Sequence, residues 1–308
     1  MRNQRGARAL DTRRTHTRCD DTRARRADVA LIIASHMLAL LRRPLLGLSV
    51  AASSTLVASA AHAAPAPAGS AVVVGVSHRP GLGFAIAERF ARGGMAVGLI
   101  GRQAERLEEC KQEILRAVPD AQVEYVQCDA TDPSAVASAF AGLKAAHGSP
   151  DALIYNLSCR PFPPTPVAEI TPDRLESDWR TGPLGALLCV QQVVPSMRER
   201  GSGTILFTGA SASLRGSANF GSFAASKSGL RVLAQSLCKE LGPEGIHVAH
   251  VVIDAIVDMP LINQFFPDAT PGRKLDPEGA AEYYWQLHAQ DKRAFTFESD
   301  LRPHEAQW

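Results

Sequence analysis

Residues 220–229 read FGSFAASKSG, a stretch that has the character of a helix start. In a helix, Lys227 lies one turn after Phe223 and two turns after Phe220, so the three side chains share a face. A lysine that faces two phenyl rings is either a packing detail or one half of a catalytic pair. Phenylalanine cannot donate a proton to a developing alkoxide, so the other half of such a pair is missing from this face.

A second chemical signal is the glycine-rich stretch GVSHRPGLG at residues 75–83. It follows an apolar run typical of a strand and opens a helical pattern, which is the context of a dinucleotide-binding turn. Glycines let the backbone turn tightly and approach a pyrophosphate, and the helix start supplies N–H groups. We therefore predict that Gly75, Gly81, Leu82 and Gly83 bind a dinucleotide.

The end of the second predicted strand bears on the choice of cofactor. Folds that prefer NAD place an acid there for the ribose hydroxyl, whereas this chain has Ile100, Gly101, Arg102 and Gln103. Arg102 could face a 2′-phosphate, with Arg79 in the glycine turn as a second candidate. The sequence thus favours NADP(H) over NAD(H), unless both arginines are simply solvated.

Apolar runs typical of strands alternate with helical patterns through the rest of the chain. Strands that are apolar throughout are buried on both faces, and their alternation with helices predicts a parallel sheet. We predict a single α/β domain over residues 70–308, a Rossmann-like doubly wound sheet. The predicted strands are 71–76, 95–101, 123–128, 152–156, 204–209, 247–253 and 294–298; the predicted helices are 83–94, 103–116, 132–146, 172–200, 221–241 and 277–289.

The order and spacing of five segments resemble the short-chain dehydrogenase/reductase family: VVVGVSHRPGLGFAIAERFA, QCDATD, DALIYNLS, GTILFTGASAS and FAASKSGLRVLAQSLCKEL. The likeness covers roughly residues 70–260. It implies that Asp129 holds the adenine and that Asn156 supports the cofactor and the sheet. It also implies that Lys227 binds the nicotinamide ribose and lowers the pKa of a catalytic tyrosine. The resemblance further implies a homodimer or homotetramer packed through the helices at 172–200 and 221–241.

Several catalytic positions depart from this family. The usual tyrosine, four residues before the lysine, is Phe223, and the usual serine is Ala210, with Ser211 next to it. The helix asparagine of the proton relay falls at Gly182. The longer glycine turn resembles a divergent branch that includes enoyl-thioester reductases, but the tyrosine of that branch falls at Phe220. Losing a positioned general acid typically costs about 10²–10⁴-fold in rate.

Other groups could replace the phenol. A serine could position a water or bind the oxyanion, with Ser211 the first candidate, or a tyrosine or histidine near the C-terminus could fold over the site. Reduction of an activated C=C bond would also need less from a protein acid. The further candidates are Ser213, Ser222, Tyr283, Tyr284 and His288.

Residues 254–275 occupy the place of the family's substrate lid. Phe265, Phe266, Leu261 and Ile262 would form an apolar wall there, or else a dimer contact. Two hypotheses follow. The first is an NADP(H)-dependent oxidoreductase that acts on a small-molecule carbonyl, alcohol or enone with a degenerate proton relay. The second is a weak or inactive NADP(H)-binding sensor or partner subunit.

The N-terminal part differs in composition from this predicted domain. Residues 1–36 are rich in arginine, threonine and aspartate and predict a disordered leader; we expect the chain to start at Met37. Residues 37–63 have the layout of a secretory signal, with Arg42 and Arg43, an apolar run and an A-x-A site, followed by a linker at 64–69. This predicts export to the periplasm. A disordered or mitochondrial-type leader on a cytoplasmic protein is the alternative.

Hydropathy, charge and cysteine spacing argue against a membrane span, nucleic-acid binding and a cysteine metal site. The apolar run of the leader is short and rich in alanine and serine, so we expect no stable membrane span. The first 63 residues hold eleven arginines and four aspartates while the whole chain is only +2, so the rest is net negative. A nucleic-acid-binding domain would need a basic face, and none is expected here. The six cysteines show no metal-binding spacing, and unpaired cysteines weigh mildly against an oxidising compartment.

Overall fold

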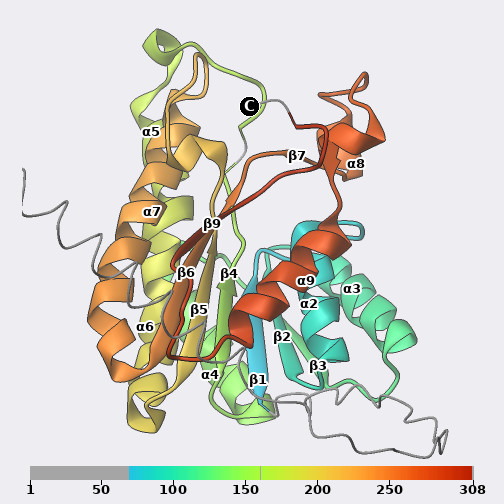
Figure 1. Ribbon diagram of the computed structural model, residues 1–308, viewed down its shortest axis with the longest axis vertical. Coiled ribbons are helices and arrows are strands. Elements are labelled where there is room, and N and C mark those ends of the chain that lie inside the picture. Colours follow the sequence, from blue (N-terminus) through green and yellow to red (C-terminus); the bar gives the residue numbers. More distant parts are fainter. Residues whose placement is uncertain (1–68, 160, 307–308) are drawn as a thin grey trace, which may run out of the picture. The chain divides into compact units, whose positions relative to one another are not determined.

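The computed structural model describes residues 69–159 and 161–306, which lie in the compact unit His62–Trp308 (Figure 1). The predicted leader at 1–36, the signal-like segment at 37–63 and most of the linker at 64–69 lie outside the described residues.

A seven-stranded parallel sheet forms the centre of this unit, in the order β3-β2-β1-β4-β5-β6-β9. Its strands are β1 (Ser70–Val74), β2 (Ala96–Gly101), β3 (Val123–Gln127), β4 (Ala152–Tyr155), β5 (Gly203–Thr208), β6 (Ile246–Ile253) and β9 (Glu298–Leu301). All residues of β1, β4 and β6 are buried. This burial on both faces explains why the strands lack a polar alternation.

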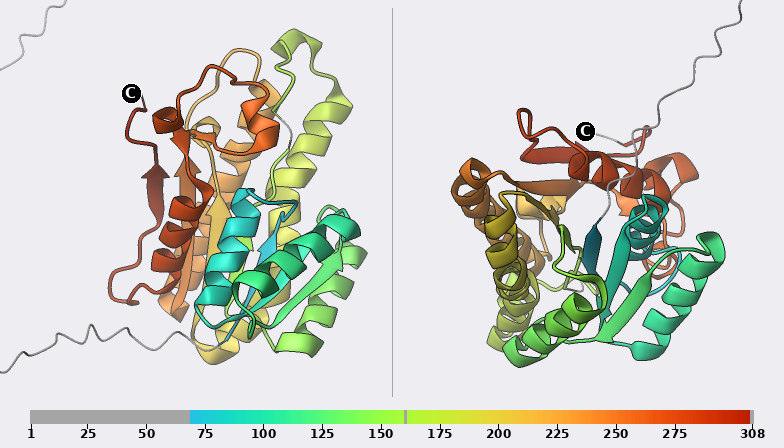
Figure 2. Two further views of the ribbon diagram at one scale, coloured as in Figure 1. Left: turned by 90° about the vertical axis from the view of Figure 1, so that its right-hand side faces the viewer. Right: turned by 90° about the horizontal axis from the view of Figure 1, so that it is seen from below.

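Helices cover both faces of the sheet (Figure 2). The longer ones are α2 (Leu82–Arg92), α3 (Ala104–Ala117), α4 (Pro133–His147), α5 (Pro172–Trp179), α6 (Gly185–Arg200), α7 (Gly221–Leu241) and α9 (Pro277–His288). Single 3₁₀ turns lie at η1 (Val167–Glu169), η3 (Ser211–Ser213), η4 (Gly242–Glu244) and η5 (Pro271–Arg273). The predicted Rossmann-like doubly wound α/β fold is confirmed.

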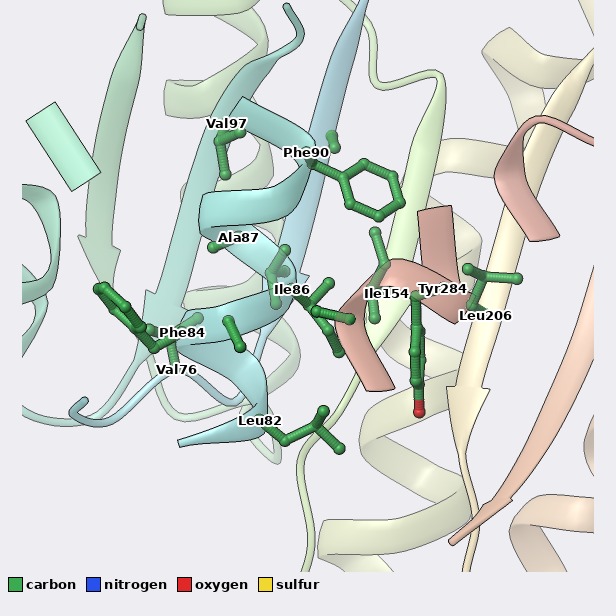
Figure 3. Close-up of a cluster of buried hydrophobic side chains, with 14 of the residues drawn as sticks. Val76, Leu82, Phe84, Ile86, Ala87, Phe90, Val97, Ile154, Leu206 and Tyr284 are labelled. Carbon is green, nitrogen blue, oxygen red and sulfur yellow. The ribbon is translucent and has the colours of Figure 1, made fainter. Parts of the chain in front are cut away.

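Two hydrophobic cores result, one on each face of the sheet. The first joins α2, α3 and α9 to the sheet through side chains such as Phe90, Ile154 and Tyr284 (Figure 3). The second joins α4, α6 and α7 to the opposite face through Phe140, Val190 and Leu230. Helix α9, at the end of the chain, thus packs against the helix that follows the glycine turn.

The helix predicted as one piece over 172–200 is interrupted. Between α5 and α6 lies one turn of π-helix, η2 (Arg180–Leu184), which contains Gly182 and Pro183. Proline lacks the N–H that continues an α-helical ladder, so the chain widens there. The last strand also differs from the prediction, since β9 begins at Glu298 and the predicted strand 294–298 ends there.

The sheet order reverses between β1 and β4, and this is where doubly wound folds form a crevice at the carboxyl ends of the strands. The segment 254–275 lies beyond the end of β6 and contains β7 (Ile256–Val257), α8 (Pro260–Asn263) and β8 (Lys274–Leu275). None of the helices in the described part of the chain is long and apolar enough to cross a membrane.

Candidate active site

A cavity of about 860 Å³ opens at the carboxyl ends of β1, β4 and β5. The glycine turn, the ends of β2 and β5, the start of α7 and the segment 254–275 all contribute to its lining. Residues as far apart in the sequence as Val74 and Phe266 therefore face one space. The cavity lies where the reversal of strand order predicts a binding crevice.

The glycine turn forms a tight cradle on one side of this cavity. Gly75, Gly81, Leu82 and Gly83 all line it. Gly75 has φ +96°, a conformation that favours glycine, and a Cβ at Gly83 would lie 2.5 Å from the Gly75 carbonyl oxygen. Asn156 Nδ2 donates to the same oxygen at 3.1 Å. Bare backbone therefore faces the cavity at the start of α2, which fits the phosphates of a dinucleotide.

The two arginines that the sequence singled out lie in different places. Arg102 lines the cavity, whereas Arg79 is absent from its lining and pairs instead with Glu113 at 3.6 Å and Glu278 at 3.8 Å. Arg106, in the first turn of α3, lines the cavity and was missed by the sequence analysis. Its signal was a second arginine at the start of the helix that follows Arg102.

Asp129, the predicted adenine-binding residue, is not among the described residues that line the cavity. Its carboxylate accepts hydrogen bonds from the Thr131 backbone N–H and hydroxyl, each at 2.9 Å. The flanking Cys128 and Ala130 line the cavity instead. The carboxylate thus braces the turn after β3.

Lys227 lies in the cavity wall with 3% of its surface exposed. Its ammonium group donates to the Thr208 carbonyl oxygen at 2.8 Å. Burial lowers the pKa of this group from 10.5 to about 8. The lysine is therefore mostly protonated at neutral pH and loses its proton at only slightly higher pH.

Thr208, whose carbonyl oxygen accepts from Lys227, also joins Asn156 and Tyr284 in a chain of hydrogen bonds. The Thr208 hydroxyl donates to Asn156 Oδ1 at 3.0 Å and lies 2.8 Å from the Tyr284 hydroxyl. Because Thr208 has a single hydroxyl proton, Tyr284 is the donor in the second bond. Tyr284 is fully buried, burial raises its pKa, and its oxygen lies at the strand ends (Figure 3). Its phenol proton is engaged within the fold and does not face the cavity.

The other candidate replacements are also engaged elsewhere. Ser213 Oγ accepts from the Ala210 N–H at 3.1 Å, and Ser222 donates to Asp178 at 2.6 Å. His288 Nδ1 lies 3.0 Å from Thr204 Oγ1, at the amino end of β5 and remote from the cavity. Of the candidates Ser211, Ser213, Ser222, Tyr283, Tyr284 and His288, Ser211 alone belongs to the described lining.

Both positions that could have carried the tyrosine face the cavity. Phe220 and Phe223 line it together with Lys227. Gly182, at the place of the relay asparagine, packs against Ser226 so closely that a side chain there would collide with the serine hydroxyl. None of these three positions therefore offers a hydroxyl or amide side chain to the cavity.

Cys159 is a cavity-lining residue that the sequence analysis did not single out. It is buried, and burial, reinforced by the Asp178 charge, raises its pKa to about 11, against a smaller opposing effect of Lys227. The thiol is therefore uncharged at neutral pH. Among the described residues, no group of histidine, cysteine or acidic side chains could hold a metal ion.

Three of the four residues predicted to form the apolar wall of the lid line the cavity. Leu261, Ile262 and Phe266 line the cavity, whereas Phe265 does not and has 44% of its surface exposed.

Known proteins match both the sequence and the fold. The short chain dehydrogenase family matches residues 70–265. The oxidoreductase asL5 of Sarocladium schorii is 30% identical over 168 residues, which are 54% of this chain and 65% of that protein. The chain therefore spans slightly less than two thirds of that relative.

Two solved structures share the fold over most of their length. A short-chain dehydrogenase from Rhodopseudomonas palustris is 32% identical with a TM-score of 0.64, covering 77% of this chain and 99% of that one. A metagenomic short-chain oxidoreductase in complex with NADP is 26% identical with a TM-score of 0.66, covering 77% and 98%. With the match to residues 70–265, these likenesses show that the chain belongs to the short-chain dehydrogenase family.

Proposed function

We propose that the protein is an NADP(H)-dependent oxidoreductase that transfers a hydride between the cofactor and a carbonyl, alcohol or enone. The observation that carries this proposal is the position of Lys227. Its buried amine, with a pKa of about 8, lines the same cavity as the glycine cradle. A scaffold without catalysis has no evident need for a desolvated lysine there.

The residues of the cavity suit NADP(H). Gly75, Gly81 and Gly83 would hold the pyrophosphate against the start of α2, and Asn156 steadies the turn. Arg102 and Arg106 would face the 2′-phosphate, and no described residue of the lining carries a carboxylate that would repel it. The NADP complex of the metagenomic relative supports this choice.

Hydride is the chemistry that the bound nicotinamide supplies. The protein must then stabilise negative charge on the substrate oxygen and deliver a proton to it. The Lys227 ammonium is the cation available in the described wall of the cavity near Phe223, and the Ser211 hydroxyl can donate a hydrogen bond from η3. In this assignment Lys227 and Ser211 carry the catalysis. Water delivers the proton that a catalytic tyrosine usually supplies in the family.

The test is cofactor binding and turnover of the full chain with Lys227→Ala, using Lys239→Ala as the matched control. Lys239 lies on the same helix, is exposed and is not part of the cavity lining. We expect Lys227→Ala to lose turnover by about 10³-fold or more while NADPH still binds, and Lys239→Ala to behave as the natural protein. Failure of the natural protein to bind NADPH would refute the proposal.

The second candidate is a weak or inactive NADP(H)-binding sensor or partner subunit. Phe220 and Phe223 in the cavity wall favour it, because neither offers a proton. The same variant separates the two functions. In a sensor, Lys227→Ala would only weaken NADPH binding, and the natural protein would show no NADPH oxidation with any carbonyl or enone offered.

Assembly and location are further parts of the proposal. Trp179 on α5 and Val232 on α7 expose 48% and 58% of their surfaces, and such apolar side chains support a homodimer or homotetramer packed through these helices. Light scattering at several concentrations tests this. Export through residues 37–63 is tested by expressing the full chain and sequencing the N-terminus of the product recovered from each compartment.

A further inference from the structure

The two ends of the cavity differ in charge. At the end near β1 and β2, the described lining includes His78, Arg102 and Arg106. The opposite end is lined by apolar side chains from the loop after β4, the start of α7 and the segment 254–275. They include Phe162, Phe220, Phe223, Met259, Leu261 and Phe266.

Four rings gather at this apolar end, and Phe162 is their centre. It stacks on Phe265 with ring centroids 4.3 Å apart and an interplanar angle of 12°. It meets Phe220 and Phe266 edge to face, at 5.9 Å and 5.6 Å. Phe162, Phe220 and Phe266 also line the cavity, so they offer ring faces and edges to whatever enters it.

We propose that the apolar end takes an uncharged carbonyl compound, or the corresponding alcohol, built on a flat unsaturated ring, and that Phe162 and Phe266 determine this specificity. The inference rests on the proposed oxidoreductase function. It narrows the substrate class from any carbonyl, alcohol or enone to cyclic conjugated or aromatic ones.

The charges of the described side chains at this end disfavour ionic substrates. A carboxylate buried without a partner loses its hydration without compensation, and among the described residues the apolar end has no cation beyond Lys227 to receive it. Asp178 offers nothing to an ammonium group either. It does not line the cavity, and it already accepts hydrogen bonds from Arg174 at 2.8 Å and Ser222 at 2.6 Å.

The rings favour a flat substrate over a flexible one. Offset-stacked and edge-to-face aromatic pairs contribute about 0.5–1.5 kcal/mol beyond the area they bury. An open alkyl chain gains no such contact and loses rotational freedom when it is confined. A rigid flat ring whose carbonyl group points toward Lys227 makes the aromatic contacts and loses little rotational freedom.

The experiment compares matched aldehydes with the full chain and NADPH. 4-Methylbenzaldehyde and 4-carboxybenzaldehyde differ in charge at nearly equal size, and 4-methylcyclohexanecarbaldehyde removes the flat ring. We expect kcat/KM for the methyl compound to exceed that for the carboxylate by about 100-fold and that for the saturated ring by about 10-fold. Calorimetric binding of the corresponding alcohols, with and without NADP⁺, gives the same comparison without turnover.

Two variants locate the specificity. Phe266→Arg places a cation at the apolar end and is expected to reverse the discrimination against 4-carboxybenzaldehyde. Its matched control is Val167→Arg, an exposed position of η1 outside the cavity lining. Phe162→Leu stays apolar but removes the ring, and is expected to abolish the preference for the benzene ring over cyclohexane. Thermal unfolding of each variant shows whether it is folded.

The outcomes distinguish the proposed substrate class from the proposed oxidoreductase function. Equal or better binding of the carboxylate by the natural protein overturns the substrate class, even where NADPH oxidation confirms an oxidoreductase. Arg160→Gln then shows whether Arg160, which lies outside the described residues, receives that carboxylate. Selective binding of the methyl alcohol without any turnover supports the substrate class and counts against the catalytic function. Because the ligand comparison uses the natural protein, it tests the substrate class even if a variant fails to fold.

Discussion

The two ends of one cavity keep different amounts of the family's chemistry. The end near β1 and β2 retains a glycine cradle and cationic side chains, Arg102 and Arg106. The end near α7 has Lys227 together with the rings of Phe220 and Phe223, which carry no hydroxyl. Dinucleotide binding depends on backbone shape and proton delivery on one hydroxyl, so the second function is far easier to lose by substitution.

The largest expected effect comes from restoring a phenol. Phe223→Tyr places a hydroxyl on the cavity wall one turn before Lys227, and we expect kcat/KM for carbonyl reduction to rise by about 100- to 1000-fold. The measurement is steady-state NADPH oxidation.

Phe220→Tyr tests the alternative register of the divergent branch in the same assay. Phe295→Tyr is a control, since that ring stacks on His247 outside the cavity lining. If neither Phe223→Tyr nor Phe220→Tyr raises kcat/KM, the missing hydroxyl does not limit the reaction.

The next effect concerns the cradle. Gly83→Ala puts a Cβ 2.5 Å from the Gly75 carbonyl oxygen and 2.9 Å from Asn156 Nδ2. Because the first of these is backbone, the turn must shift, and we expect NADPH affinity to fall by about 100-fold, measured by fluorescence titration. Gly142→Ala, where a Cβ meets no atom within 4 Å, should leave affinity unchanged.

Lys227 should also make stability depend on pH. Its pKa in the folded chain is about 8, below the value of 10.5 for a solvated lysine, so between these values the unfolded chain binds more protons. The free energy of unfolding should therefore rise with pH across this window, by about 2 kcal/mol. Denaturant unfolding of the natural protein and of Lys227→Met measures the difference. A similar slope in Lys227→Met would assign the effect to another group, and the exposed Lys239 gives the control Lys239→Met.

The smallest effect is the contribution of each arginine to cofactor choice. Arg102→Ala and Arg106→Ala should each weaken NADPH by about 10-fold and leave NADH unchanged, because only NADPH carries the 2′-phosphate. Arg79→Ala should not change the ratio, since Arg79 pairs with Glu113 and Glu278 away from the lining. An equal loss of both cofactors would mean that the arginines contact the pyrophosphate instead.

The sequence alone determined the fold and the shape of the cofactor site. The apolar runs of β1, β4 and β6 predicted strands buried on both faces, and the spacing of Gly75, Gly81 and Gly83 predicted the turn. These signals are local, because strand burial and backbone conformation depend on neighbouring residues. The sequence likewise placed Lys227 on one face with Phe220 and Phe223.

Only the tertiary structure decided which distant side chains reach the cavity. It brought Arg106, Cys159 and Phe162 into the lining and left Arg79 and Asp129 out of it. It also engaged the hydroxyl of Tyr284 with Thr208, from a helix 76 residues further along the chain. Such choices follow from packing between elements that are remote in sequence, and hydrogen bonds that bury a polar group within the fold remove it from chemistry.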